Sequence, residues 1–180
     1  MVKDYLGIFY VKMTHLSDNN LEWIQPASRY YYATFTSDSQ KISTMKVNQI
    51  FKNNDKSRFY LFGTGNKYEA NAGYDYVIEQ DENNFDGSFI IFRDIKNDSL
   101  EFTASLSRFS TNHEYPLKGY SMQIGETIFT DCLLMDNTNS GYKYQPEEDE
   151  IRINKFIISK EFGLIYYQLY SGEEYFRKFD

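Results

Sequence analysis

LEFTASLS, residues 100–107, is the stretch of the sequence that decides the fold class. Its apolar side chains Leu100, Phe102, Ala104 and Leu106 alternate with polar ones, so they lie on one side of an extended chain. This alternation predicts a strand with one face on the core and the other in water, which is typical of antiparallel sheets.

Similar segments lie on both sides of this stretch at short, even intervals. They are rich in β-branched and aromatic residues, and turn sequences such as KNND and KNDS separate them. Residues 41–51 fit a helical stripe as well as a strand face, and we read them as strand. The expected strands are residues 5–13, 29–36, 41–51, 58–62, 74–79, 88–95, 100–107, 120–124, 127–135, 151–159, 164–170 and 175–179.

This pattern predicts an all-β, antiparallel fold of about ten to twelve short strands with little helix. Both a barrel and a sandwich-like curled sheet agree with strands at this spacing. The composition does not change abruptly along the 180 residues, so a single β domain, 1–180, is expected.

The closing stretch, residues 159–179, reads as strands around two turns. Gly163 lies where a tight turn needs a positive φ angle, which glycine adopts without steric strain. The strand after it is apolar on both faces, so we expect it to be covered on both. The expected faces are Ile165, Tyr167 and Leu169 on one side and Leu164, Tyr166 and Tyr170 on the other.

Four pieces of the last third carry a resemblance to other proteins. They are residues 125–134, 156–160, 163–167 and 172–176, which place a hairpin, an aromatic strand, a Gly-Leu-Ile step and a Gly-acidic turn in order. This order resembles a C-terminal cassette in uncharacterised β domains of Bacteroidetes-type bacteria, many of which look like cell-envelope lipoproteins. The resemblance implies a bacterial β-sheet domain and no particular activity.

Charge and hydropathy exclude several classes of protein. The net charge is −7, with 19 basic and 26 acidic residues, whereas nucleic-acid binders present a basic face. No apolar run approaches the roughly 18 residues of a membrane span, and residues 1–13 lack the apolar core of a signal peptide. The expected location is the cytoplasm for the chain as written, or the cell envelope if an export signal has been removed.

Catalytic and metal-binding patterns are weak. His15 and His113 have no second histidine, cysteine or carboxylate at ligand spacing, so we expect no metal site and no cofactor. Cys132 lies inside an apolar strand without a basic neighbour that would favour its thiolate. These features predict a protein that is not an enzyme.

Tyrosine is the most unusual component, with 17 residues in the chain. Its rigid, amphipathic ring suits binding surfaces, although tyrosines also close the ends of barrels. We therefore predict a non-catalytic binding or accessory protein that engages a protein partner. The acidic run at residues 147–150 favours a partner with a basic surface. The alternative is a β-barrel that binds a glycan or small molecule, and an enzyme of unrecognised type is less favoured. The candidate binding residues are Tyr30, Tyr31 and Tyr32, and, in the long loop 136–150, Tyr142, Tyr144, Glu147 and Glu148.

Overall fold

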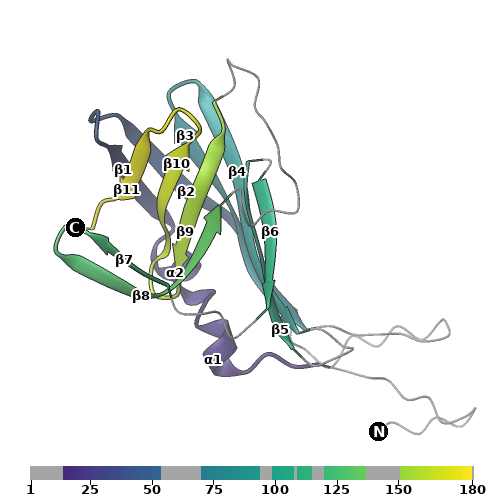
Figure 1. Cartoon of the computed structure of the whole chain (residues 1–180). Coiled ribbons are helices and arrows are strands. Elements are labelled where there is room, and N and C mark those ends of the chain that lie inside the picture. Colours follow the sequence, from purple (N-terminus) through teal and green to yellow (C-terminus); the bar gives the residue numbers. More distant parts are fainter. Residues whose placement is uncertain are drawn as a thin grey trace, which may run out of the picture.

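The structure is a computed structural model that describes residues 14–53, 70–93, 99–107, 109–114, 120–136 and 151–179. They form two short helices and one antiparallel sheet of eleven strands (Figure 1), which confirms the predicted all-β fold. The helices are α1 (Asp18–Leu21) and α2 (Gln25–Arg29). The strands are β1 (Tyr32–Ser37), β2 (Ile42–Asn53), β3 (Asn71–Gln80), β4 (Asn83–Arg93), β5 (Leu100–Leu106), β6 (Phe109–Glu114), β7 (Tyr120–Ile124), β8 (Thr127–Asp136), β9 (Ile153–Ser159), β10 (Gly163–Leu169) and β11 (Glu174–Arg177).

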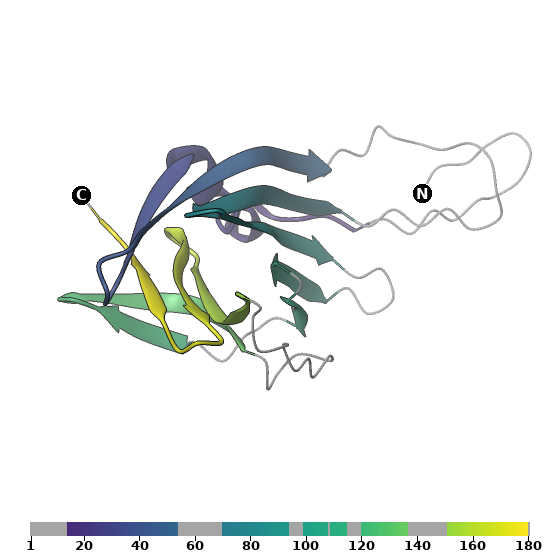
Figure 2. The same cartoon turned by 90° about the horizontal axis from the view of Figure 1, so that it is seen from above.

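The strand order is β6-β5-β4-β3-β2-β1-β11-β10-β9-β8-β7. Neighbours in this order are also neighbours in the sequence except for β1 and β11, which pair with Phe35 opposite Arg177. Within the described residues, β6 and β7 are the two ends of the order, so the sheet is curled and open rather than closed. Figure 2 shows β2–β4 and β9–β11 facing each other across the interior. Of the two predicted architectures, the curled sheet is therefore the one observed.

The predicted strand at residues 100–107 is β5, and its alternation works as expected. Leu100, Phe102, Ala104 and Leu106 are all buried, while the residues between them are partly exposed. The ambiguous residues 41–51 are also strand, within β2. The strands expected at 5–13 and 58–62 lie outside the described residues.

The two helices were not predicted, and α2 includes Arg29, where the sequence predicts the start of a strand. A capping box begins α1, because the Ser17 hydroxyl accepts the Asn20 amide at 3.3 Å and the Asn20 side chain accepts the Ser17 amide at 3.0 Å. Pro26 lies in the first turn of α2, where a missing amide hydrogen is harmless. The expected strand 29–36 therefore begins only at Tyr32. In the described part of the chain, no helix is both long and apolar enough to cross a membrane.

The segment between the helices packs into the interior of the sheet. The Trp23 ring lies 5.9 Å from the Phe89 ring and 5.1 Å from the Phe102 ring, measured between centroids. Its side chain is buried, as is that of Ile24. One cluster of buried side chains thus joins the helical segment to β4 and β5, and this burial outweighs the weak propensity of such short helices.

The predicted faces of β10 are wrong at its start. Leu164 belongs to the interior cluster with Tyr167 and Leu169, whereas Ile165 and Tyr166 both belong to a cluster on the outer face. The reason is a register irregularity against β9 between Leu164 and Tyr166, since an extra residue reverses the alternation. The expectation that this strand is covered on both faces is confirmed, because all five of these residues are buried.

A bend in β8 covers the outer face. Asp131 has a positive φ of 53°, and β8 pairs with β9 only from Cys132 onward. The part of β8 before the bend pairs with β7 and brings Phe129 against Ile165 and Tyr166. The hairpin of β7 and β8 thereby contributes Phe129 and Cys132 to the outer cluster, which also contains side chains of β9 and β10.

Turn positions agree in part with the sequence. Gly163 has the predicted positive φ, at 74°. By contrast, residues 81–87, DENNFDG, have the composition of a turn, but β4 begins at Asn83 and includes most of them. Gly87 lies opposite Tyr76 in the pairing of β4 with β3. A Cβ atom at residue 87 would lie only 2.3 Å from the Tyr76 ring, so the position needs a glycine.

Candidate functional site

The three consecutive tyrosines differ in exposure, because Tyr30 is half-buried and Tyr31 and Tyr32 are exposed. The centroid of the Tyr30 ring lies 5.6 Å from that of the Phe162 ring and 4.7 Å from the guanidinium carbon of Arg177. Tyr31 and Tyr32 instead remain 42% and 66% exposed. Tyr30 therefore supports the fold, whereas its two neighbours present aromatic surface to solvent. Tyr142, Tyr144, Glu147 and Glu148, the other candidates, lie outside the described residues.

The two exposed rings contact each other. The Tyr31 and Tyr32 centroids lie 5.2 Å apart with an angle of 69° between the planes, which is the edge-to-face arrangement that aromatic pairs prefer. The Tyr31 carbonyl accepts the Val47 amide at 2.9 Å, so the main chain beneath the rings is held to β2. The two exposed rings therefore lie over main chain that is hydrogen-bonded to the sheet.

Polar and apolar side chains extend this surface over β1 and β2. Tyr32 lies opposite Lys46, and Thr34 lies opposite Thr44. Ile42, opposite Thr36, is 57% exposed. Alternation along both strands places these side chains on the face that points away from the core. We call Tyr31, Tyr32, Thr34, Ile42, Thr44 and Lys46 the tyrosine face.

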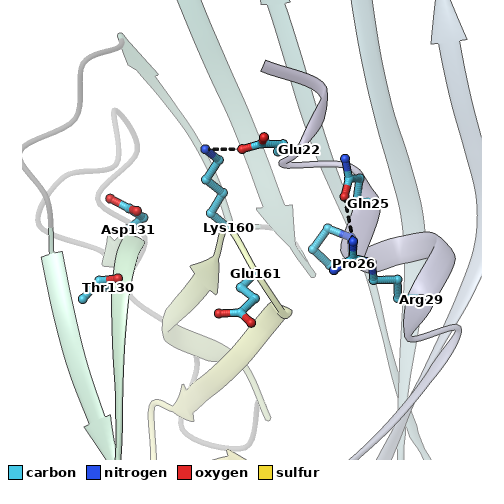
Figure 3. Close-up of a pocket in the computed structure, with 8 residues that line it drawn as sticks. All are labelled: Glu22, Gln25, Pro26, Arg29, Thr130, Asp131, Lys160 and Glu161. Atoms are coloured by element: carbon cyan, nitrogen blue, oxygen red, sulfur yellow. Dashed lines mark hydrogen bonds and ion pairs between the residues drawn. The ribbon is translucent and has the colours of Figure 1, made fainter. Parts of the chain in front are cut away.

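A polar cleft of about 320 Å³ opens on another part of the molecule (Figure 3). It lies where the helical segment, the bend of β8 and the turn between β9 and β10 meet. Pro26 is the apolar residue of its lining. The other lining residues are Glu22, Gln25 and Arg29 from the helical segment, Thr130 and Asp131 from β8, and Lys160 and Glu161 from the turn.

Lys160 connects the three walls of the cleft. Its ammonium lies 2.7 Å from a Glu22 carboxylate oxygen and donates to the Asn19 side chain at 3.2 Å. Its main-chain amide donates to the Asp131 carbonyl at 3.1 Å. Across the cleft, Arg29 donates to the Gln25 side-chain carbonyl at 3.1 Å. The shape of the cleft therefore depends on contacts between segments that are far apart in the sequence.

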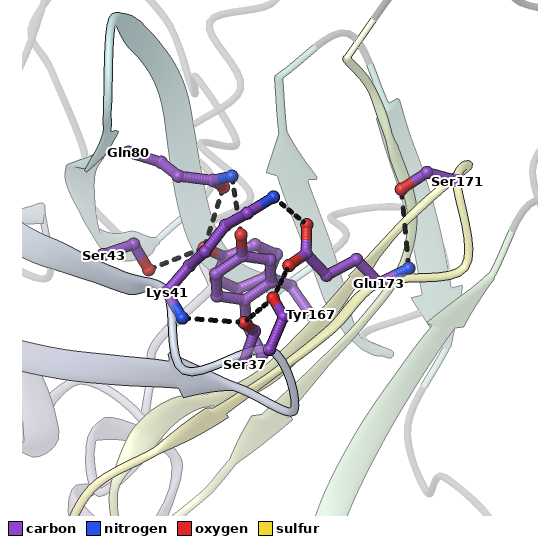
Figure 4. Close-up of polar contacts among 9 residues, drawn as sticks. Ser37, Lys41, Ser43, Gln80, Tyr167, Ser171 and Glu173 are labelled. Atoms are coloured by element: carbon purple, nitrogen blue, oxygen red, sulfur yellow. Dashed lines mark hydrogen bonds and ion pairs between the residues drawn. The ribbon is translucent and has the colours of Figure 1, made fainter.

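A cluster of hydrogen-bonded polar side chains lies at one end of the sheet interior (Figure 4). The Gln80 amide donates to the Tyr175 hydroxyl at 2.7 Å, and the Tyr167 hydroxyl donates to the Gln80 carbonyl at 3.2 Å. The Tyr167 hydroxyl also lies 2.6 Å from the Ser43 hydroxyl. The two tyrosine rings stack with centroids 4.7 Å apart. These buried groups satisfy one another, as polar groups in a core must.

Burial also sets the ionisation of these tyrosines. Desolvation raises the pKa of Tyr167 well above its ordinary value, and the pKa of Tyr175 rises to about 12 through desolvation and the nearby Glu173 carboxylate. Both hydroxyls therefore stay protonated at neutral pH. Hydrogen bonds among neutral, mutually paired groups stabilise the fold and leave no group poised for proton transfer in this cluster.

Cys132 lies in the outer cluster at 2% exposure. Burial is the main cause that raises its pKa to about 11, so the reactive thiolate is scarce at neutral pH. No group of three or more metal-ligating side chains occurs among the described residues.

Comparison of the chain with protein-family models, with curated proteins and with solved structures finds no match. The resemblance of the last third to Bacteroidetes-type β domains therefore stays a prediction.

Proposed function

We propose that this chain is a non-catalytic binding protein that engages a protein partner through the tyrosine face. The observation that carries the proposal is the pair of exposed rings, Tyr31 and Tyr32, which contact each other with centroids 5.2 Å apart. Tyrosine is enriched among the residues that dominate protein interfaces, because its ring covers a large area and its side chain loses little entropy on binding.

The surroundings of the two rings favour a protein over a small ligand. Ile42 and the threonines of β1 and β2 extend the surface along the sheet, and Lys46 adds one charge beside Tyr32. A surface with an aromatic and aliphatic centre and polar neighbours has the composition of a protein interface. Small ligands instead prefer concave sites that enclose them.

The proposal is tested with tagged chains and extracts of the cells that produce this protein. The test variant carries Tyr31→Ala and Tyr32→Ala together. The control is Ile128→Ala, because Ile128 is 65% exposed, as Tyr32 nearly is, but lies on β8, outside the tyrosine face. A protein retained by the unchanged chain and the control, but not by the double variant, supports the proposal.

The captured protein is then purified and titrated. Loss of two central tyrosines is expected to weaken binding at least about 30-fold, the effect of removing an interface hot spot of about 2 kcal/mol. A partner that binds the double variant as tightly as the unchanged chain contradicts the proposal and places the binding site elsewhere.

A further inference from the structure

We propose that the polar cleft between α2, the bend of β8 and the β9–β10 turn binds a neutral, polyhydroxylated ligand of the size of a sugar ring. The cleft does not include the tyrosine face, so this inference is independent of the proposed protein partner. Three features of the cleft support it: unpaired hydrogen-bonding groups, charges of both signs and a rigid frame.

The first feature is a set of polar side chains without partners. Among the residues that the structure describes, neither the Asp131 carboxylate, the Glu161 carboxylate nor the Thr130 hydroxyl makes a hydrogen bond or ion pair. Arg29 uses one nitrogen for Gln25, and its guanidinium has further donors. The cleft thus offers carboxylates that only accept and a guanidinium that only donates.

The second feature is the charge that remains in the cleft. Lys160 and Glu22 neutralise each other at 2.7 Å, which leaves Asp131, Glu161 and Arg29. A phosphate would face the two unpaired carboxylates, and an ammonium would face the Arg29 guanidinium, so each would meet repulsion from one of these groups. A hydroxyl group donates to a carboxylate and accepts from a guanidinium, so it meets neither. Neighbouring hydroxyls on one ring can satisfy both kinds of group at once.

The third feature is the rigidity of the frame. Lys160 joins the turn to the helical segment through Glu22 and Asn19, and to β8 through the Asp131 carbonyl. Asp131 itself has a left-handed main chain, with φ of 53°, a conformation that persists in non-glycine residues when the surroundings enforce it. Groups held in place before binding lose less entropy when a ligand arrives.

Size and apolar surface agree with this ligand class. About 320 Å³ is at the small end of the roughly 300–1,000 Å³ of small-molecule sites. Pro26 lies among the polar groups of the lining and can contact the carbon-bound hydrogens of a sugar ring.

The test is an NMR titration of the full chain labelled with nitrogen-15. The probes are glucose, galactose, mannose and xylose, added one at a time, with inorganic phosphate and methylammonium as charged comparisons. The expected result is that at least one sugar shifts the main-chain amide signals of Thr130, Asp131, Lys160 and Glu161 to saturation, and that phosphate and methylammonium do not.

Two variants assign the binding to the cleft. Asp131→Asn removes the charge but keeps a residue that tolerates the left-handed main chain, and it is expected to weaken sugar binding at least about tenfold through loss of a charge-assisted hydrogen bond. Glu161→Gln, in an exposed turn, gives the same test if the first variant does not fold. Glu126→Gln, at the tip of the β7–β8 hairpin, is the control and should bind as the unchanged chain does.

Any one of three results would overturn the inference. The first is that none of the four sugars shifts the cleft signals to saturation, and the second is that a charged probe saturates them instead. The third is that the variants at Asp131 and Glu161 bind the sugar as tightly as the unchanged chain does.

Discussion

Replacement of Gly163 by valine should destabilise the fold through two separate effects. The main chain at Gly163 has φ of 74°, a region that disfavours any residue with a Cβ atom by roughly 1–2 kcal/mol. A Cβ atom here would lie 3.4 Å from both the Pro26 side chain and the Tyr74 hydroxyl, which is ordinary contact. The two further methyl groups of valine exceed that space, and overpacking of this kind costs roughly 1–3 kcal/mol. The expected total is therefore about 2–5 kcal/mol.

Gly172 provides a matched control for the main-chain effect. It also has a positive φ, at 90°, but no atom lies within 4 Å of its Cβ position. Gly172→Val should therefore lose only the main-chain part, about 1–2 kcal/mol. Gly163→Ala should lose a similar amount, because its Cβ fits without displacing Pro26 or Tyr74.

Urea unfolding followed by tryptophan fluorescence is the appropriate measurement. Trp23 is the single tryptophan of the chain and is 5% exposed, so its emission reports the loss of the core. At this chain length, each kcal/mol should also lower the melting temperature by about 2–4 °C. Equal midpoints for Gly163→Val and Gly172→Val would show that Pro26 and Tyr74 do not approach Gly163 closely. A Gly163→Val midpoint equal to that of the unchanged chain would refute the positive φ.

Two further predictions concern ionisable groups. Burial alone would raise the pKa of the Glu173 carboxyl, but hydrogen bonds from Ser39, Lys41 and Ser37 lower it below its ordinary value. A lowered folded-state pKa means that the ionised carboxylate stabilises the fold above the unfolded-state pKa, and that this stabilisation is lost as the pH falls through the folded-state pKa. Urea midpoints should therefore show Glu173→Gln to be less stable than the unchanged chain at neutral pH and equally stable in strong acid, and a constant difference would refute this. Cys132, with a pKa raised to about 11 chiefly by burial, should react with iodoacetamide at neutral pH only after unfolding in urea, and mass spectrometry of the folded chain would detect any earlier reaction.

Regular strands could be predicted because the side on which a residue lies depends mainly on whether its own side chain is apolar or polar. In β5, apolar and polar residues alternate without interruption, and burial follows the pattern. The pattern failed in β10, because the irregularity after Leu164 comes from pairing with β9 and leaves no mark in the sequence of β10 itself. The short helices were missed for a related reason. Their visible signals are the capping pair Ser17 and Asn20, and Pro26 at the start of α2, and residues of these types also favour turns.

The candidate sites were predictable to different degrees. Exposed tyrosine could be expected from three consecutive tyrosines on an alternating strand, although the half-buried position of Tyr30 depends on Phe162 and Arg177, which come much later in the sequence. The cleft could not be expected. Its residues come from three segments with no common spacing, and only folding brings Glu22 within 2.7 Å of Lys160.

The pairing of β1 with β11 has a consequence for the order of events when the ribosome makes this chain. Strands β2 to β6 can each pair with the strand made just before, as successive hairpins. The other edge of β1, by contrast, has no partner until β11 emerges, long after β1 itself, since Phe35 pairs opposite Arg177. Ladders between distant segments form slowly, and unpaired edges recruit other chains. The nascent protein therefore passes through a long interval in which one edge of β1 is unpaired and open to aggregation.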